Sequence, residues 1–136
     1  MKQGKYPTYP VLLVDDEELF LKSAAFILKG GGINHVISCS DSRKVIPMLQ
    51  ERTFSAIALD LSMPHISGYE LLPKIIEDFP GTPVVIITAT NEVETVVQCM
   101  KQGALDYLVK PIKSDSLINA VNQAIKFHKL NSENSR

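Results

Sequence analysis

Four short apolar runs along the chain each end at a polar residue with reactive chemistry. Continuous apolar runs of this length, bounded by turn residues, indicate strands that are buried in a parallel sheet. The runs are Val11–Val14, Ala56–Leu59, Val84–Ile87 and Tyr107–Val109, and they are followed by Asp15 and Asp16, by Asp60, by Thr88, and by Lys110 and Pro111. Because ligands bind beyond the carboxyl ends of such strands, the pattern gathers three carboxylates, a hydroxyl and an ammonium at one edge.

Between these runs, apolar residues recur at helical spacing, which predicts that helices alternate with the strands. The expected helices are Glu17–Lys29, a segment opened by Asp41 or Ser42, a segment capped by Ser67 and Glu70, Glu92–Gln102, and a last helix opened by Ser114 or Asp115. A weaker run at Val36–Cys39 supplies a fifth strand. Parallel strands need crossover helices of one hand, so five strand-then-helix units predict an α/β fold with a doubly wound five-stranded parallel sheet.

Each expected helix has an apolar face that should pack against the sheet. The face of the first helix comprises Leu19, Phe20, Ala24, Ile27 and Leu28, and that of the fourth comprises Val93, Val96, Val97 and Met100. These residues follow the three- and four-residue spacing of one helical face. They are therefore predicted to point inward.

Two prolines interrupt the helical patterns. Pro47 and Pro73 would each remove a hydrogen bond and clash with the preceding turn, so a kink or a late helix start is expected at both. The chain is otherwise divided into an arm at 1–9, one domain at 10–128 and a polar tail at 129–136. The residues from 131 onward are expected to fray.

The composition fits a single globular domain and removes several classes of function. The 136 residues are enough for one full core. A net charge of −1 argues against electrostatic binding of the whole domain to nucleic acid or to an anionic membrane. The two cysteines, Cys39 and Cys99, are too few for a disulfide framework and are expected to be buried free thiols. No apolar stretch is long enough to span a membrane and no signal peptide opens the chain, which predicts a cytoplasmic protein.

The three carboxylates suit a hard divalent cation. Mg²⁺ prefers one or two carboxylates together with water and phosphate oxygens, and Asp15 with Asp16 would supply them. The alternative is an acidic helix start, since acidic residues favour the positive end of a helix dipole. Asp60 at the end of a neighbouring strand favours the metal, because three crowded carboxylates repel one another unless a cation is bound. An ionised Asp60 could then attack phosphorus as a nucleophile, although a lone Asp could also cap the next turn.

Lys110 and Thr88 offer partners for phosphoryl oxygens. The Lys110 ammonium is a point charge on a flexible stem, and Thr88 carries a hydroxyl. Alone, Lys110 would be interpreted as a solvated strand end and Thr88 as an ordinary β-branched strand residue. Their joint position at strand ends favours the functional interpretation.

The residues in this order resemble the receiver domain of bacterial two-component response regulators over about residues 10–128. The similarity rests on four motifs, VDDE at Val14–Glu17, DLSMPHISG at Asp60–Gly68, TA at Thr88 and Ala89, and GALDYLVKP at Gly103–Pro111. The resemblance implies a strand order of 2-1-3-4-5. It also implies Mg²⁺ as cofactor, and a sensor histidine kinase or phosphotransfer protein as the partner that phosphorylates the chain.

The resemblance further implies a role for each site residue. Asp60 would be the phosphoacceptor, Asp15 and Asp16 would bind Mg²⁺ with the backbone carbonyl of Ser62, and Lys110 would pair with the phosphoryl group. The remaining roles are a switch hydroxyl at Thr88, a rotating aromatic at Tyr107 and a cis peptide bond before Pro111. The phosphorylated domain would later dephosphorylate itself. It would control an output, such as transcription, through a homodimer formed by the fourth helix, fifth strand and fifth helix.

Three other functions are compatible with parts of the pattern. A phosphorylation-independent interaction module would keep the fold without using the site, but the set of five site residues is complete. A Mg²⁺ phosphohydrolase with an aspartate nucleophile would want a second acid where the chain has Ser62. A flavin-binding relative would want a phosphate-cradling loop where Asp15–Glu18 would repel phosphate. His65 is expected to occupy a surface or loop position, and contact with the site entrance beside Pro64 is the alternative.

Overall fold

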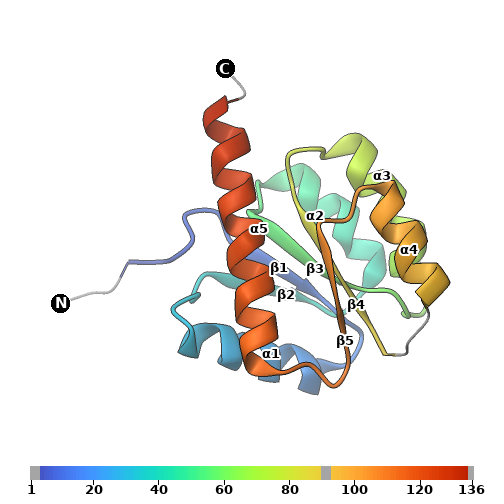
Figure 1. The fold of residues 1–136 in the computed structure, drawn as a ribbon, viewed down its shortest axis with the longest axis horizontal. Coiled ribbons are helices and arrows are strands. Elements are labelled where there is room, and N and C mark those ends of the chain that lie inside the picture. Colours follow the sequence, from blue (N-terminus) through green and yellow to red (C-terminus); the bar gives the residue numbers. More distant parts are fainter. Residues whose placement is uncertain (1–3, 90–92, 135–136) are drawn as a thin grey trace.

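The computed structural model, which describes residues 4–89 and 93–134, has five parallel strands in the order β2-β1-β3-β4-β5 (Figure 1). The strands are β1 (Val11–Val14), β2 (Val36–Cys39), β3 (Ala56–Asp60), β4 (Val84–Thr88) and β5 (Asp106–Val109). Every strand pair is parallel, with β1 lying between β2 and β3. The predicted fold class and the strand order implied by the resemblance are confirmed.

Helices cover both faces of the sheet. They are α1 (Glu18–Gly30), α2 (Val45–Glu51) after a short 3₁₀ helix η1 (Ser42–Lys44), α3 (Gly68–Asp78), α4 (Val93–Gln102) and α5 (Ser114–Asn134). Alternate residues of each strand point to opposite faces, so the core divides into two layers. Leu12 and Val14 pack with α2, α3 and α4, whereas Val11 and Leu13 pack with α1 and α5.

The inward faces of α1 and α4 match the prediction only in part, since Ala24, Leu28 and Val96 are buried as expected and several other members are exposed. On α1, Leu21, Ala24 and Leu28 are buried, and Leu19 is 84% exposed. On α4, Val96 and Cys99 are buried, while Val93 is 69% exposed and Val97 and Met100 are also exposed. Both helices carry apolar residues on more than one face, so their spacing alone does not decide which face meets the sheet. The expected start of this helix at Glu92 lies outside the described residues.

The two prolines have different positions in their helices. Pro47 is the third residue of α2, where a proline ring is tolerated because the first amide groups of a helix have no partner inside it. The late helix start expected there is confirmed, since η1 precedes α2. Pro73 lies in the interior of α3, well after its first residue, so a late start at Pro73 is wrong. It cannot donate to the carbonyl of Tyr69, and both side chains are exposed.

The helix α5 continues further than the sequence suggests. It begins with Ser114 as a helical residue and runs through Asn134, so the expectation that the chain frays from residue 131 is wrong for 131–134. No glycine or proline occurs after Pro111 to end the helix. Among the described residues, none of the helices is long and apolar enough to cross a membrane.

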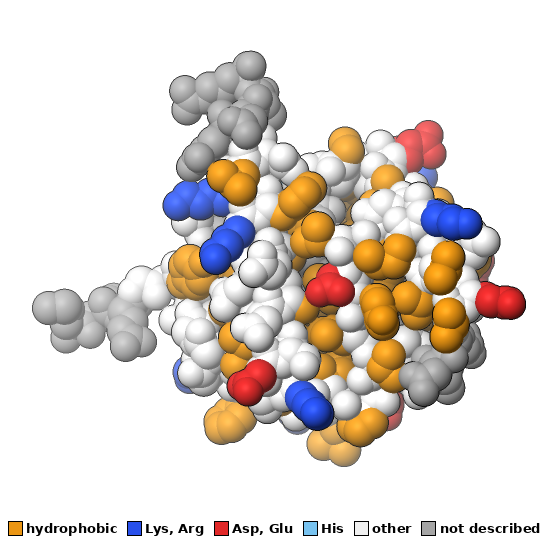
Figure 2. Space-filling view, viewed as in Figure 1, with side chains coloured by type: hydrophobic (Ala, Val, Ile, Leu, Met, Phe, Trp, Pro, Cys, Tyr) orange, Lys and Arg blue, Asp and Glu red, His pale blue; other side chains and the backbone are white. Residues whose placement is uncertain are grey.

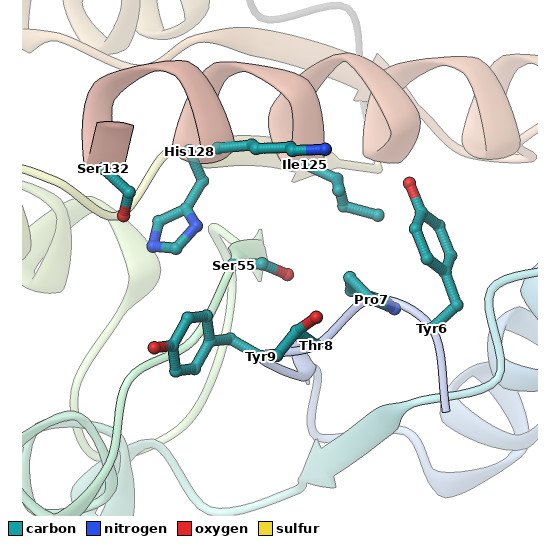
Figure 3. A pocket seen from close by; sticks show the side chains of 9 residues that line it. Tyr6, Pro7, Thr8, Tyr9, Ser55, Ile125, His128 and Ser132 are labelled. Atoms are coloured by element: carbon teal, nitrogen blue, oxygen red, sulfur yellow. The ribbon is translucent and has the colours of Figure 1, made fainter. Parts of the chain in front are cut away.

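The arm before β1 packs beside the carboxyl-terminal half of α5. The backbone of Tyr6 bonds to the Asn34 side chain and to the amides of Asn34 and His35, which fixes the arm next to β2. Figure 3 shows Tyr6–Tyr9 facing Ile125 and His128 of α5 across a cavity of about 270 Å³. The rings of Tyr9 and His128 meet edge to face, with their centroids 5.7 Å apart. This cavity lies where β3 begins, away from the strand ends that carry the acidic residues.

Candidate active site at the carboxyl edge of the sheet

Three carboxylates converge where β1 and β3 end. One oxygen of each of Asp15, Asp16 and Asp60 lies within 4.8 Å of the other two. They meet because β1 and β3 are neighbours and Val14 is paired with Leu59, which places the two strand ends side by side. Asp15 is fully buried and Asp60 is 3% exposed, whereas Asp16 is exposed. The cluster is therefore closed toward the core and open on the side of Asp16.

Lys110 supplies positive charge to this cluster. Its Nζ lies 2.8 Å from Oδ2 of Asp15 and 3.3 Å from Oε1 of Glu17, and 4.3 Å from the ring centroid of Phe20. Burial by itself lowers the pKa of Lys110. The hydrogen bond and charge of Asp15, the charge of Asp60 and the contact with Glu17 outweigh burial, so the pKa is raised overall. The ammonium thus stays charged, and it is fixed against one wall of the cluster.

Asp60 is ionised at neutral pH, but at a cost in free energy. Its burial and the negative charge of Asp15 raise its pKa to about 6, while Lys110 and the Ser62 amide act in the opposite direction. That amide donates to Oδ1 of Asp60 over 3.4 Å. A cation bound between the carboxylates would remove the repulsion that Asp60 experiences.

This cost predicts that Asp60→Asn stabilises the metal-free protein. The folded pKa of about 6 lies above the ordinary aspartate value of 3.8, so the folded state binds more protons than the unfolded state between these values, and stability falls as the pH rises through this range. In a chelator at about pH 7.5, the variant should unfold with a free energy about 1–2 kcal/mol higher than the wild type. Urea titrations at neutral and acidic pH measure the difference. It should vanish below about pH 4, and a wild type as stable as the variant at neutral pH would refute the account.

The loop from β3 to α3 brings the backbone close to Asp60. A Cβ atom at Gly68 would overlap the backbone oxygen of Asp60, so this position requires glycine. The Gly68 amide donates to the carbonyl of Leu61 over 3.1 Å. The predicted capping box is confirmed, since Ser67 Oγ accepts from the Glu70 amide and Glu70 Oε1 accepts from the Ser67 amide. These bonds fix the far end of the loop that begins at the cluster.

Thr88, Tyr107 and Pro111 lie at or near the ends of the next two strands. Thr88 is the last residue of β4 and is buried, and its carbonyl accepts from the Lys110 amide over 2.7 Å. Asp60 is paired with Ile87, so Thr88 is one residue further along the neighbouring strand. Tyr107 is 45% exposed on β5. The peptide bond between Lys110 and Pro111 is cis.

Sequence reasoning missed two neighbours of Lys110. Glu17 accepts a hydrogen bond from Lys110 and donates its own amide to Asp15 Oδ1 over 2.8 Å. The sequence pattern presents Glu17 as part of an acidic helix start. Its place directly after two expected metal ligands is the signal that could have indicated a contact with the site. Phe20 lies on α1 three residues after Glu17, and nothing in the sequence pattern marks it as a neighbour of Lys110. His65 lies in the β3–α3 loop with an exposed side chain.

Comparison with known families gives one match that covers most of the chain. The model of the family described as the response regulator receiver domain matches residues 11–122. A putative NtrX-like response regulator of Rickettsia bellii is 36% identical over 126 residues, covering 91% of this chain and 26% of that protein. The transcriptional regulatory protein ZraR of Escherichia coli strain K12 is 34% identical over 115 residues, covering 85% of this chain and 26% of that protein. The chain therefore spans about a quarter of the length of these curated relatives.

Solved structures have the same architecture. A response regulator receiver domain protein from Clostridium thermocellum is 31% identical, with a TM-score of 0.82 over 90% of this chain and 98% of that chain. The structure of NtrX from Brucella abortus in complex with ATP is 30% identical, with a TM-score of 0.83 over 93% of this chain and 29% of that chain. The similarity thus covers the sheet together with the loops that carry the acidic cluster.

Proposed function

Because this chain belongs to the response regulator receiver domain family, we propose that Asp60 is its phosphoacceptor and that a sensor histidine kinase or phosphotransfer protein is the donor. The observation that carries the proposal is the buried Asp60 carboxylate, which lies in one cluster with Asp15 and Asp16. The charged Lys110 is fixed to the same cluster through Asp15. A carboxylate suited to act as the nucleophile, oxygen ligands suited to a cation and a counter-charge thus lie together, which supports phosphoryl transfer to Asp60.

The carboxylates fit Mg²⁺. Their oxygens are hard ligands, and their mutual distances allow one ion to contact all three side chains. In the proposal Asp15, Asp16 and Asp60 hold the ion together with the backbone carbonyl of Ser62. When bound, Mg²⁺ supplies positive charge that offsets the carboxylates and the phosphoryl oxygens.

Asp60, Lys110 and Thr88 each have a separate role in the phosphoryl transfer. A carboxylate oxygen of Asp60 attacks phosphorus in line, the bond from phosphorus to the donor nitrogen breaks, and the imidazole leaves with its electron pair. The Lys110 ammonium pairs with a phosphoryl oxygen, and the Thr88 hydroxyl binds another. Water later attacks the phosphorus of the acyl phosphate, which releases phosphate and restores the Asp60 carboxylate.

Phosphorylation would act as a switch through two residues at the edge of the sheet. Thr88 moves toward the phosphoryl group and Tyr107 turns inward from its exposed position on β5. The added charge therefore biases two arrangements of the surface around α4 and β5.

The direct test is to load the site with a small donor. Acetyl phosphate with Mg²⁺ should add one phosphoryl group to the chain, and beryllium fluoride with Mg²⁺ should occupy the same site. Intact-mass spectrometry and fluorine NMR measure the two results. A chain that acquires neither group would instead act as a phosphorylation-independent interaction module, which overturns the proposal.

The face of α4, β5 and α5 supports the further proposal of a homodimer. Apolar side chains gather over α4 and the neighbouring edge of the sheet (Figure 2). The large apolar side chains that these three elements expose are Val93, Val97, Met100, Tyr107, Phe127 and Leu130. Exposed apolar residues grouped on one face are typical of a surface that binds another protein. Phosphorylation would favour pairing of two copies through this face.

This proposal predicts that Val97→Glu prevents dimer formation. A charge at the centre of an apolar interface would be buried without a partner, so dimerisation after beryllium fluoride treatment should weaken by about tenfold or more. Sedimentation velocity measures it. Leu19→Glu is the matched control, because Leu19 is also apolar and exposed but lies on α1. Equal dimerisation of the Val97 variant and the wild type would contradict the proposed interface.

A further inference from the structure

The loop between β3 and α3 contains a tight turn with unfavourable backbone geometry. The Ile66 amide donates to the carbonyl of Pro64 over 3.0 Å, which closes a three-residue turn around His65. His65 has φ of 71°, the left-handed region that residues other than glycine rarely adopt. Such a conformation persists where the surrounding structure holds it in place.

The hydroxyl of Ser42 contacts both ends of this turn. Ser42 Oγ donates to the carbonyl of Pro64 over 2.9 Å and accepts from the amide of Ile66 over 3.1 Å. Ser42 is 2% exposed, so water does not compete for these bonds. Because the hydroxyl bonds to the residue on each side of His65, it ties the turn to η1, which leads into α2.

Ser42 is itself fixed by the residues around it. It is the first residue of η1, and the Asp41 side chain that precedes it accepts from the Arg43 amide over 3.0 Å. The Arg43 guanidinium also pairs with the Asp41 carboxylate. The hydroxyl therefore has a defined position, as a device that orients another segment requires.

The turn lies within the loop that joins Asp60 to α3. At the near end of the loop, the Ser62 amide contacts Asp60. At the far end, Gly68 packs on the backbone of Asp60 and bonds to Leu61. The turn at His65 is in the middle, three residues after Ser62 and three residues before Gly68.

We propose that Ser42 is a positioning residue for the metal-dependent phosphorylation of Asp60. Its hydroxyl holds the turn at His65, and the turn keeps the backbone of Ser62 aligned with the acidic cluster. This inference rests on the proposed function, because it assigns Ser42 an effect on the cation and the phosphoryl group. Ser42 contacts neither, and it acts through the loop.

The test compares Ser42→Ala with Ser40→Ala, a matched control at an exposed serine nearby. Ser42→Ala should weaken Mg²⁺ binding by about tenfold, the usual effect of losing an outer contact that orients a ligand. Calorimetric titration measures the affinity. In the metal-free protein, hydrogen exchange of the Ile66 amide should accelerate in Ser42→Ala and not in the control.

A second substitution separates positioning from simple stability. Glycine adopts a positive φ without strain, so His65→Gly removes the need for the hydroxyl. In the double variant, Mg²⁺ affinity should recover most of the loss caused by Ser42→Ala. If Ser42→Ala fails to fold, Ser42→Cys, a weak donor of similar shape, replaces it in both comparisons.

The outcomes distinguish this inference from the proposed function. A wild type that neither binds Mg²⁺ nor accepts a phosphoryl group overturns the proposed function. A wild type that does both, with Ser42→Ala matching Ser40→Ala in affinity and in Ile66 exchange, overturns the role of Ser42 alone. An affinity loss that His65→Gly leaves uncorrected also contradicts positioning through the turn.

Discussion

Asp60→Asn abolishes covalent phosphorylation of the chain. After incubation with acetyl phosphate and Mg²⁺, the variant should keep its unmodified mass, while the wild type gains one phosphoryl group. The reason is chemical, since a neutral amide oxygen is a poor nucleophile and forms no stable acyl phosphate. Asparagine has nearly the same shape as aspartate, so the cluster around it is kept.

Asp78→Asn is the matched control for this experiment. Asp78 is exposed at the end of α3, where it pairs with Lys74. Its variant should be phosphorylated at the wild-type rate. The Asp60 variant should also be folded, because the loss of the carboxylate relieves repulsion from Asp15. A phosphoryl group on the Asp60 variant, at Thr88 or at another carboxylate, would refute the assignment.

Asp16→Ala weakens Mg²⁺ binding and with it the Mg²⁺-dependent phosphorylation of the chain. Asp16 is the exposed member of the cluster, so its loss leaves the buried core unchanged. The affinity for Mg²⁺ should fall by at least about 10–100-fold, since changes to groups outside the ligand shell already cost this much. Phosphorylation by acetyl phosphate at low Mg²⁺ should fall in parallel. Calorimetric titration and intact-mass spectrometry measure the two effects.

The control for Asp16 lies in the same acidic run. Glu18 is the first residue of α1 and is exposed, and it is not part of the carboxylate cluster. Glu18→Ala changes the net charge equally, so any general loss of attraction for Mg²⁺ appears in both variants. An Asp16 variant that binds Mg²⁺ as well as the Glu18 variant would show that the acids at this point only start a helix.

The strands and their ends could be predicted from the sequence because their pattern allows one interpretation. A continuous apolar run such as Val84–Ile87 fits a buried strand, and the polar residue that stops it must lie at the edge of the sheet. The buried face of a helix could be predicted only in part. On α1, both Leu19 and Leu21 fit an apolar stripe, and contact with the sheet decides that Leu21 is the buried one. The end of α5 could not be predicted, because the polar residues after its apolar face are compatible both with a continued helix and with an irregular tail.

In the site, too, some residues could be predicted from the sequence pattern and others depend on contacts made only in the folded chain. Asp15, Asp16 and Asp60 could be identified because topology alone brings two strand ends together. The roles of Glu17 and Ser42 depend on the reach of a lysine side chain and on one tight turn. Ser42 precedes the turn by more than twenty residues, and a single serine at a helix start normally indicates a cap. Such contacts depend on the folded arrangement of the chain, and residue spacing does not predict them.

Chemical mapping of the acyl phosphate tests the central claim most directly. Reduction of the phosphorylated wild type with borohydride converts an aspartyl phosphate into homoserine, and peptide mass spectrometry locates the converted residue. We expect conversion at Asp60 alone and only when Mg²⁺ is present. Conversion at Asp15 or Asp16, or a wild type with no reducible acyl phosphate after treatment with acetyl phosphate, would contradict the account.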